Sequence, residues 1–234
     1  MSIETNRLNK EEYQKGFHCN MHPSLDLKKA KIEANRCYFC HDAPCITACP
    51  TDIDIPMFIR QISTENVKGS AETIFAENIL GGTCARVCPT ESLCEGACVR
   101  NPSEDKPVTI GSLQQFATDT YMTKDGHPFT RSASTGKKIA VVGAGPAGLS
   151  CAHGLARRGH DVVMFEAKDK AGGLNEYGIA PYKMTDNFAA EEVKFVTSIG
   201  GIKTEYGKRL GHNLELSSLQ KDYDAVFLGF GMSG

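Results

Sequence analysis

The spacing of apolar residues changes about halfway along the chain. In the first half, apolar residues recur three or four positions apart, which is the spacing of one face of a helix. This spacing predicts helical structure over Leu25–Arg36, Ile55–Leu80 and Ile110–Tyr121, after a polar N-terminal arm. Pro56 suits the first turn of a helix, because its missing N–H would have no partner there. The first half of the chain is therefore expected to be helical.

The second half alternates short apolar runs with helical segments, an order that predicts a βαβ arrangement. The predicted strands are Lys138–Val142, Asp161–Glu166, Ile202–Tyr206 and Ala225–Gly229, and the predicted helices are Leu149–Arg158 and Asn187–Ser198. Between the halves, Met122–Lys138 is rich in Thr, Ser, Gly and Lys and is expected to be a linker. The fold class is therefore α + α/β, with an all-helical domain over residues 1–130 and a Rossmann-like domain over residues 137–234.

The length of the chain limits the number of domains, and its charge limits the kinds of molecule that it can bind. The chain has 234 residues, enough for one or two domains. Its formal net charge of -2 provides no field that would attract nucleic acid or an anionic membrane. No apolar run approaches the ~20 residues of a membrane span, and the N-terminus is too polar for a signal peptide. We expect a cytoplasmic protein whose partners include neither nucleic acid nor membrane.

Eight of the ten cysteines lie in two blocks, while Cys19 and Cys151 stand apart. The blocks are Cys37-x2-Cys40-x4-Cys45-x3-Cys49-Pro50 and Cys84-x3-Cys88-Pro89-x4-Cys94-x3-Cys98. In two-cluster ferredoxins, the cysteine followed by proline typically binds the other cluster. The spacing predicts that Cys37, Cys40 and Cys45 hold one cubane and that Cys49 crosses to a second. The second block would then supply the remaining ligands of both clusters.

Structural zinc and buried free thiols are the alternatives for these cysteines. Zinc sites favour paired C-x2-C knuckles, often with histidine. Only one such pair is present, and both blocks are long and marked by proline. His41 lies inside the first block and is expected to be a bystander. Iron–sulfur chemistry is therefore the favoured interpretation.

A glycine turn follows the first predicted strand. The residues Gly143, Ala144, Gly145, Pro146, Ala147 and Gly148 form a G-x-G-x-x-G motif between a strand and a helix. In this motif the first glycine permits the turn, the second lets the backbone approach a pyrophosphate, and the third lets the helix pack closely. Glu166 ends the next strand, where a carboxylate can bind ribose hydroxyls. The motif predicts a dinucleotide site, without deciding between FAD and NAD.

Longer segments of the chain resemble one known family. The cysteine blocks, the segment FAENILGGTCARVCPTESLCEGAC at 75–98, IGSLQQFATD at 110–119 and the GAGPAG turn closely resemble the N-terminal part of dihydropyrimidine dehydrogenase. The resemblance extends from about Ala34 to Gly231, and the small subunit of bacterial glutamate synthase shares the same module. It implies a two-cluster ferredoxin-type helical domain followed by an FAD-binding domain.

The resemblance also implies particular ligands. One 4Fe-4S cluster would be held by residues matching Cys37, Cys40, Cys45 and Cys98, and the other by residues matching Cys49, Cys88, Cys94 and Gln114. The residue matching Cys84 is not a ligand in the family, although spacing alone favours it. A glutamine ligand would change both the charge and the donor strength around the iron, and both tune the reduction potential.

For the nucleotide, the resemblance implies that the glycine turn binds FAD. Gly173 lies in the matching flavin-lining stretch, and Leu174, Lys183 and Leu210 match flavin contacts of the family. Relatives continue with an NAD(P)H domain and a return segment that completes the flavin domain. Because the sequence stops at Gly234, we expect a fragment or subunit with an incomplete flavin domain and an NAD(P)H domain supplied in cis or in trans.

The expected function is electron transfer between FAD and two 4Fe-4S clusters in an NAD(P)H-dependent oxidoreductase, with a partner subunit or domain receiving the electrons. Dihydropyrimidine dehydrogenase chemistry, the reduction of pyrimidines, is favoured. The alternatives are a glutamate synthase small-subunit fragment and a zinc-bound docking module without redox activity. No side chain is predicted to act as a catalytic acid, base or nucleophile, and Cys151 is expected to be a packed small residue.

Overall fold

A computed structural model describes residues 22–123 and 126–231. The chain divides into two compact units. The first, called the helical unit, comprises Met1–Asp125 and Pro181–Thr185, and the second, called the sheet unit, comprises Gly126–Ala180 and Asp186–Gly234. The predicted polar arm and Cys19 lie outside the described residues, except for the last positions of the arm. No helix among the described residues is long and apolar enough to cross a bilayer.

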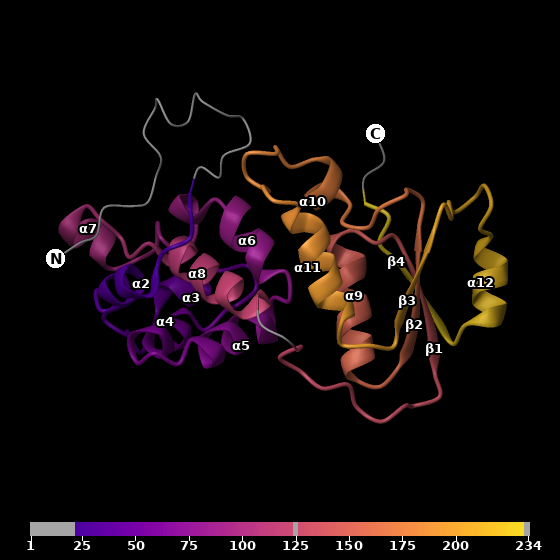
Figure 1. Ribbon diagram of the computed structural model, residues 1–234, viewed down its shortest axis with the longest axis horizontal. Coiled ribbons are helices and arrows are strands. Elements are labelled where there is room, and N and C mark those ends of the chain that lie inside the picture. The colour runs from indigo at the N-terminus through magenta and orange to yellow at the C-terminus, as the bar shows by residue number, and fades with distance from the viewer. Residues whose placement is uncertain (1–21, 124–125, 232–234) are drawn as a thin grey trace. The chain divides into compact units, whose positions relative to one another are not determined.

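The helical unit is built from short helices around one central helix, α8 (Ile110–Met122), as Figure 1 shows. Nine of the 13 residues of α8 are buried, and it packs against α2, α4, α5 and α6. The other elements are α2 (Leu27–Ala34), α3 (Pro44–Thr47), α4 (Ile55–Ser63), α5 (Val67–Glu77), α6 (Gly81–Val87), the 3-10 helix η1 (Thr90–Ser92) and α7 (Arg100–Glu104). The helix α8 therefore forms the centre of this unit.

The helical region predicted over Ile55–Leu80 is divided into α4 and α5. The break has a local cause, because Glu65 adopts a φ of 64° that no continuing helix accommodates. The next residue, Asn66, then caps α5, its side chain accepting the N–H of Gly69 at 3.0 Å. α2 is also shorter than the predicted Leu25–Arg36, since Asp26 is its N-cap. The short elements α3, α6, η1 and α7 lie in or beside the cysteine blocks and were not predicted.

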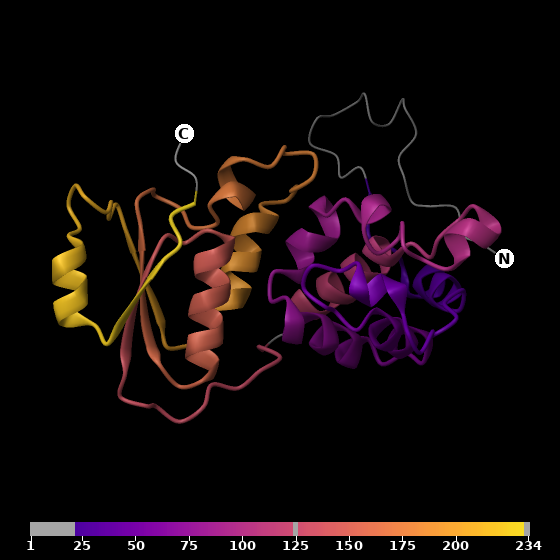
Figure 2. The ribbon, with the colours of Figure 1, turned by 180° about the vertical axis from the view of Figure 1, so that it is seen from behind.

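The sheet unit contains four parallel strands in the order β3-β2-β1-β4. The strands are β1 (Lys138–Val142), β2 (Asp161–Glu166), β3 (Ile202–Tyr206) and β4 (Ala225–Leu228). Figures 1 and 2 show α9 (Pro146–Arg157) and α11 (Phe188–Thr197) on one face of the sheet and α12 (Leu216–Asp222) on the other. The strand predictions are confirmed, except that β4 ends one residue early. The one-turn helix α10 (Leu174–Tyr177) and α12 were not predicted.

Part of the stretch predicted as a linker is attached to the sheet unit. The Ser132 N–H donates to the Arg157 carbonyl, and the Thr135 N–H donates to the Gly159 carbonyl, each at 3.0 Å. Arg131 forms an ion pair with Asp161 at the start of β2. Residues 131–135 are therefore an ordered part of this unit.

In the same stretch, the half-buried His127 packs against the buried His153 of the sheet unit. The His127 ring lies 4.9 Å from the His153 ring of α9 and 5.2 Å from the Phe195 ring of α11, centroid to centroid. The Nε2 atoms of His127 and His153 are buried and have no hydrogen-bond partner among the described residues. Burial, and to a smaller extent the neighbouring His127 and Arg157, lower the pKa of His153 to about 4. Burial also lowers the pKa of His127. Both rings are therefore packed as neutral groups.

This packing predicts acid sensitivity of the sheet unit. In the unfolded chain His153 takes up a proton below about pH 6.5, whereas in the folded unit it does so only near pH 4. Stability contributed by the neutral ring is present above pH 6.5 and is lost as the pH falls from 6.5 towards 4. His153→Phe should remove roughly 1–2 kcal/mol of the stability difference between pH 7.5 and pH 5, measured by urea denaturation.

The exposed His212 provides the matched control. His212→Gln should leave the pH dependence of the unfolding free energy as in the unchanged protein. An identical loss of stability at pH 5 in His153→Phe and the unchanged protein would contradict the account of the buried pair.

Candidate cluster and nucleotide sites

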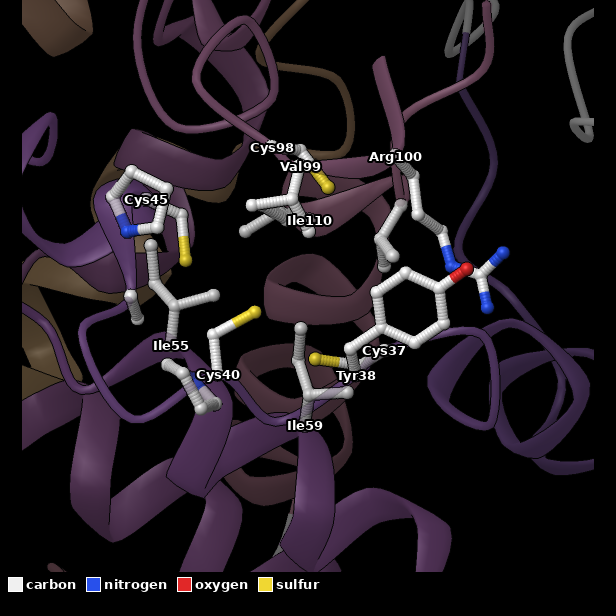
Figure 3. A pocket seen from close by; sticks show the side chains of 14 residues that line it. Cys37, Tyr38, Cys40, Cys45, Ile55, Ile59, Cys98, Val99, Arg100 and Ile110 are labelled. Carbon is white, nitrogen blue, oxygen red and sulfur yellow. The ribbon is translucent and has the colours of Figure 1, made fainter. Parts of the chain in front are cut away.

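Four cysteines from both blocks converge on one pocket of the helical unit. Cys37, Cys40 and Cys45 come from the first block, and Cys98 is the last cysteine of the second. Figure 3 shows their sulfur atoms directed into the same space. The rest of the lining is largely apolar and consists of Tyr38, Ala43, Pro44, Ile55, Pro56, Ile59, Val99, Arg100, Val108 and Ile110. Four soft donors around an apolar pocket are the donor set that an iron–sulfur cubane requires.

The backbone of the first block turns back on itself to place its thiols. Phe39 adopts a φ of 52°, a left-handed conformation that is uncommon outside glycine and asparagine. In this turn the Phe39 N–H donates to the Cys37 sulfur at 3.4 Å, a bond that favours the thiolate. Burial nevertheless raises the pKa of Cys37, and it raises the pKa of Cys45 to about 12. Bound iron would therefore have to displace the thiol protons.

A second group of thiols gathers around the end of α6. Cys49, Cys88 and Cys94 lie close enough for the charge of Cys49 to raise the pKa of the other two, after the larger effect of burial. Cys88 ends α6 with an extended backbone, and Pro89 follows it. The Cys49 sulfur also lies 3.5 Å from the Thr51 hydroxyl. Cys49 thus does not line the first pocket and lies near Cys88 and Cys94 of the second block, and its binding to a second cluster stays a prediction.

Gln114 and Cys84 belong to this second group as well. Gln114 lies on the central helix α8, is 6% exposed, and donates its side-chain N–H to the Gly81 carbonyl at 2.8 Å. Its amide also hydrogen-bonds the Cys84 thiol, whose pKa is raised to about 12, chiefly by burial. Cysteine spacing offered no signal for Gln114, which entered only through the family resemblance. The second group therefore holds five side chains, one more than a cubane needs.

A buried ion pair, which was not predicted from the sequence, connects the segments that carry the thiols. Arg36, next to Cys37, donates to the Glu33 carboxylate at 2.7 Å, and the Thr109 N–H donates to the same oxygen at 2.9 Å. The Arg36 guanidinium also donates to the Lys106 carbonyl at 2.6 Å. Arg100, two residues beyond Cys98, donates to the Arg36 carbonyl. The first block, the end of the second block and the start of α8 are thereby held together.

In the sheet unit, two of the three motif glycines are required by packing. Gly143 has a φ of 97°, and a Cβ there would lie 2.4 Å from the Gly229 carbonyl oxygen. A Cβ on Gly148 would lie 1.8 Å from the Gly143 carbonyl oxygen, so helix and strand could not approach as they do. Gly145 differs, because a Cβ there would meet its nearest atom at 3.7 Å and its φ of -81° suits any residue. The packing of this unit therefore does not require glycine at 145.

Some of the other residues predicted to bind the nucleotide lie beside this turn. The Glu166 carboxylate accepts the N–H groups of Ala144 at 2.8 Å and Lys168 at 2.9 Å. The Gly172 N–H donates to the Ala144 carbonyl at 2.8 Å. A Cβ on Gly173, whose φ is 54°, would lie 2.7 Å from the Gly145 Cα. The end of β2, the glycine turn and the segment before α10 therefore meet at the start of α9.

Pro146 and Ala147 are in the first turn of α9, where no side chain among the described residues caps the helix. The amide groups at this end are oriented to bind phosphate oxygens. Leu174 follows Gly173 directly and is 74% exposed. Lys183 lies in the Pro181–Thr185 segment of the helical unit, and its predicted flavin contact stays a prediction. Leu210 packs against a core cluster of the sheet unit, and its predicted flavin contact also stays a prediction.

Comparisons with known proteins find relatives of both halves of the chain. Residues 14–126 match the family described as dihydropyrimidine dehydrogenase domain II, 4Fe-4S cluster, and residues 141–177 match the NAD(P)-binding Rossmann-like domain. The chain is 40% identical over 220 residues to the NAD-dependent dihydropyrimidine dehydrogenase subunit PreT of Salmonella typhimurium. The match covers 94% of this chain and 53% of that protein. The Escherichia coli K12 subunit PreT is 37% identical over the same shares of the two chains.

The glutamate synthase [NADPH] small chain of Escherichia coli K12 is 36% identical over 204 residues, which is 87% of this chain and 43% of that one. Among solved structures, histamine dehydrogenase from Rhizobium sp. 4-9 is 23% identical over 77% of this chain and 24% of its own, with a TM-score of 0.37. At that score the likeness does not establish a shared fold. The chain spans about half the length of the PreT subunits that it matches. It belongs to the oxidoreductase family that includes the dihydropyrimidine dehydrogenase subunit PreT and the glutamate synthase small chain.

Proposed function

We propose that this chain carries electrons between FAD, bound at the glycine turn, and two 4Fe-4S clusters, bound by the two cysteine groups. The observation that carries the proposal is the convergence of four thiols from both blocks on one pocket. Independent structural zinc knuckles would draw neighbouring cysteines together within a block. Sharing of ligands between blocks is instead the pattern of two-cluster ferredoxins.

In this proposal Cys37, Cys40, Cys45 and Cys98 hold the first cluster. The ligands of the second are Cys49, Cys88, Cys94 and Gln114. The family resemblance supports Gln114 over Cys84, and the hydrogen bond from its amide nitrogen to the Gly81 carbonyl orients the amide. When bound, the clusters supply one-electron transfer and the flavin exchanges two electrons with NAD(P)H. The protein positions the cofactors and tunes their reduction potentials.

The chain's own residues set the conditions around the first cluster. Ile55, Ile59 and Ile110 line the pocket with hydrocarbon, which excludes water and lowers the local dielectric constant. The Phe39 N–H donates to the Cys37 sulfur, and a hydrogen bond of this kind raises the reduction potential of a cluster. No acid, base or nucleophile is needed from the protein for such transfer.

The nucleotide site is proposed to bind FAD by its adenosine diphosphate portion. The N-terminal amides of α9 would bind the pyrophosphate, and the space at Gly145 lets it approach the backbone. Both Glu166 oxygens accept a backbone N–H, and each keeps a lone pair for a ribose hydroxyl. The matched Rossmann-like domain is described as NAD(P)-binding, and FAD presents the same adenosine diphosphate.

The pathway beyond this chain is proposed from its relatives. A partner subunit or domain would receive the electrons for pyrimidine reduction, and an NAD(P)H domain would supply them in cis or in trans. The match to PreT is longer and closer than the match to the glutamate synthase small chain, which favours the pyrimidine reaction over glutamate synthesis. The cytoplasm is the proposed location, because reduced cysteines at this density persist there.

The cluster proposal predicts the iron content of cysteine variants. The full chain, reconstituted anaerobically, should contain about eight iron and eight sulfide ions and absorb broadly in the visible. Cys98→Ala should lose about half of both, because Cys98 is the single ligand that the second block gives to the first pocket.

Cys151 in α9 of the sheet unit is the matched control, and Cys151→Ala should retain the full iron content. A colourless protein that binds zinc in place of iron would contradict the proposal and favour a docking module. Iron loss of equal size in both variants would show that the Cys98 result is nonspecific.

The nucleotide proposal predicts different effects of alanine at two glycines. Gly145→Ala should leave the urea midpoint nearly unchanged but weaken FAD binding by about tenfold or more, because only the ligand needs that space. Gly148→Ala should destabilise the sheet unit by roughly 2 kcal/mol or more, since the new methyl group overlaps the Gly143 carbonyl.

Flavin fluorescence quenching measures the affinity, and urea denaturation measures the stability. If Gly145→Ala bound FAD as tightly as the unchanged protein, the pyrophosphate would not lie against this turn. A parallel titration with NADH tests the competing nucleotide. Stronger binding of NADH than of FAD at this turn would overturn the flavin assignment.

A further inference from the structure

Cys84 belongs to the second group but is not one of the proposed iron ligands. It lies on α6, four residues before Cys88, and the Cys88 N–H donates to the Cys84 carbonyl at 2.9 Å. Residues four apart on a helix project from the same face. The two thiols are accordingly hydrogen-bonded to each other. Cys84 therefore contacts a proposed iron ligand directly.

Cys84 also contacts the other unusual member of the group. The Gln114 amide hydrogen-bonds the Cys84 thiol, and its nitrogen donates to the Gly81 carbonyl at 2.8 Å. An amide nitrogen has two hydrogens, so α6 can engage both, one through Gly81 and one through Cys84. The carbonyl oxygen of Gln114 is then the part of the amide left to face a metal. This arrangement gives a physical reason why a neutral glutamine can act as a ligand here.

We propose that Cys84 is a positioning residue of the second cluster: its sulfur accepts an N–H of Gln114, and its S–H donates to the sulfur of Cys88. This inference rests on the proposed function, because it requires Cys88 and Gln114 to bind iron. A thiol not bound to iron keeps its proton and can donate it in a hydrogen bond. Hydrogen bonds to ligand sulfurs stabilise the more negative, reduced cluster. Cys84 thus raises the reduction potential of the second cluster relative to a site without it.

The direction of the effect follows from what a substitution removes. Cys84→Ala takes away both the donor to Cys88 and the acceptor for Gln114, so the reduced state loses stabilisation. The substitution leaves the backbone of α6 intact, because alanine favours a helix at least as well as cysteine does. The first pocket does not include Cys84. The change should therefore be confined to one of the two clusters.

The test is redox titration of the full chain, reconstituted anaerobically with iron and sulfide and followed by electron paramagnetic resonance. Cys84→Ala should retain the iron content of the unchanged protein, while the potential of one cluster becomes more negative and its resonance signal changes. The other cluster should keep its potential. Cys84→Ser retains a donor and an acceptor in the same place and should restore the potential in part. Cys151→Ala should reproduce the unchanged protein in every readout.

Two results would overturn the inference. Unchanged potentials and spectra in Cys84→Ala at full iron content would show that the thiol does not act on the cluster. Loss of one cluster in Cys84→Ala, together with full retention in Gln114→Ala, would show that Cys84 is itself the ligand. Failure of the proposed function is a different outcome, since the unchanged protein would then hold no iron–sulfur clusters at all.

Discussion

The buried ion pair between Glu33 and Arg36 is the constraint on which the first pocket depends. Its carboxylate and guanidinium are almost fully buried. The Lys106 and Pro107 carbonyls accept hydrogen bonds from Arg36, and the Thr109 N–H donates to one oxygen of Glu33, whose other oxygen has no partner among the described residues. Removing one partner of such a pair leaves a buried charge, at a cost of about 3–5 kcal/mol. Because Arg36 precedes Cys37 and Thr109 precedes α8, the pair sets where the first thiol stands relative to the central helix. Cysteines that are distant in the sequence can then converge on one pocket, although only short helices carry them.

In the sheet unit, too, the packing of the protein itself shapes the candidate site, but the contacts are of a different kind. There, contacts between backbones take the place of a buried ion pair, and Gly143 and Gly148 allow strand, turn and helix to touch. The turn is further held by Glu166, whose carboxylate accepts the Ala144 N–H. Of the three motif glycines, only Gly145 leaves room that the fold does not use. Both candidate sites are therefore shaped by packing and hydrogen bonds within the protein, which fix the geometry before any ligand binds.

The sequence predicted the regular parts of this fold well and the irregular parts poorly. The strands β1 and β2 are largely buried and read as apolar runs, which is why their bounds agree with the prediction. The more exposed and more polar β3 also has its predicted bounds. The break at Glu65 depends on one left-handed residue, which apolar spacing cannot reveal. The short helices beside the cysteines bury too little apolar surface to show a period.

For the cluster sites, cysteine spacing indicated two groups of ligands and predicted that Cys49 belongs to the second group. It did not decide which residues complete each group. The placement of Cys98 in the first pocket agrees with the family resemblance, and Gln114 could come from nowhere else, since a buried glutamine has no distinguishing spacing. Glu33 and Arg36 lie three residues apart on a helix, a pattern that usually marks a solvated surface pair. Their burial depends on packing against residues distant in the sequence, so it cannot be predicted from the residues around them.

Anomalous X-ray scattering at the iron absorption edge, from crystals of the anaerobically reconstituted chain, tests the central claim most directly. The account predicts two compact iron sites in the helical unit. One should lie between Cys37, Cys40, Cys45 and Cys98, and the other should be bound by Cys49, Cys88, Cys94 and the oxygen of Gln114. Scattering at the zinc edge instead, or a single iron site served by the cysteines of one block alone, would contradict it.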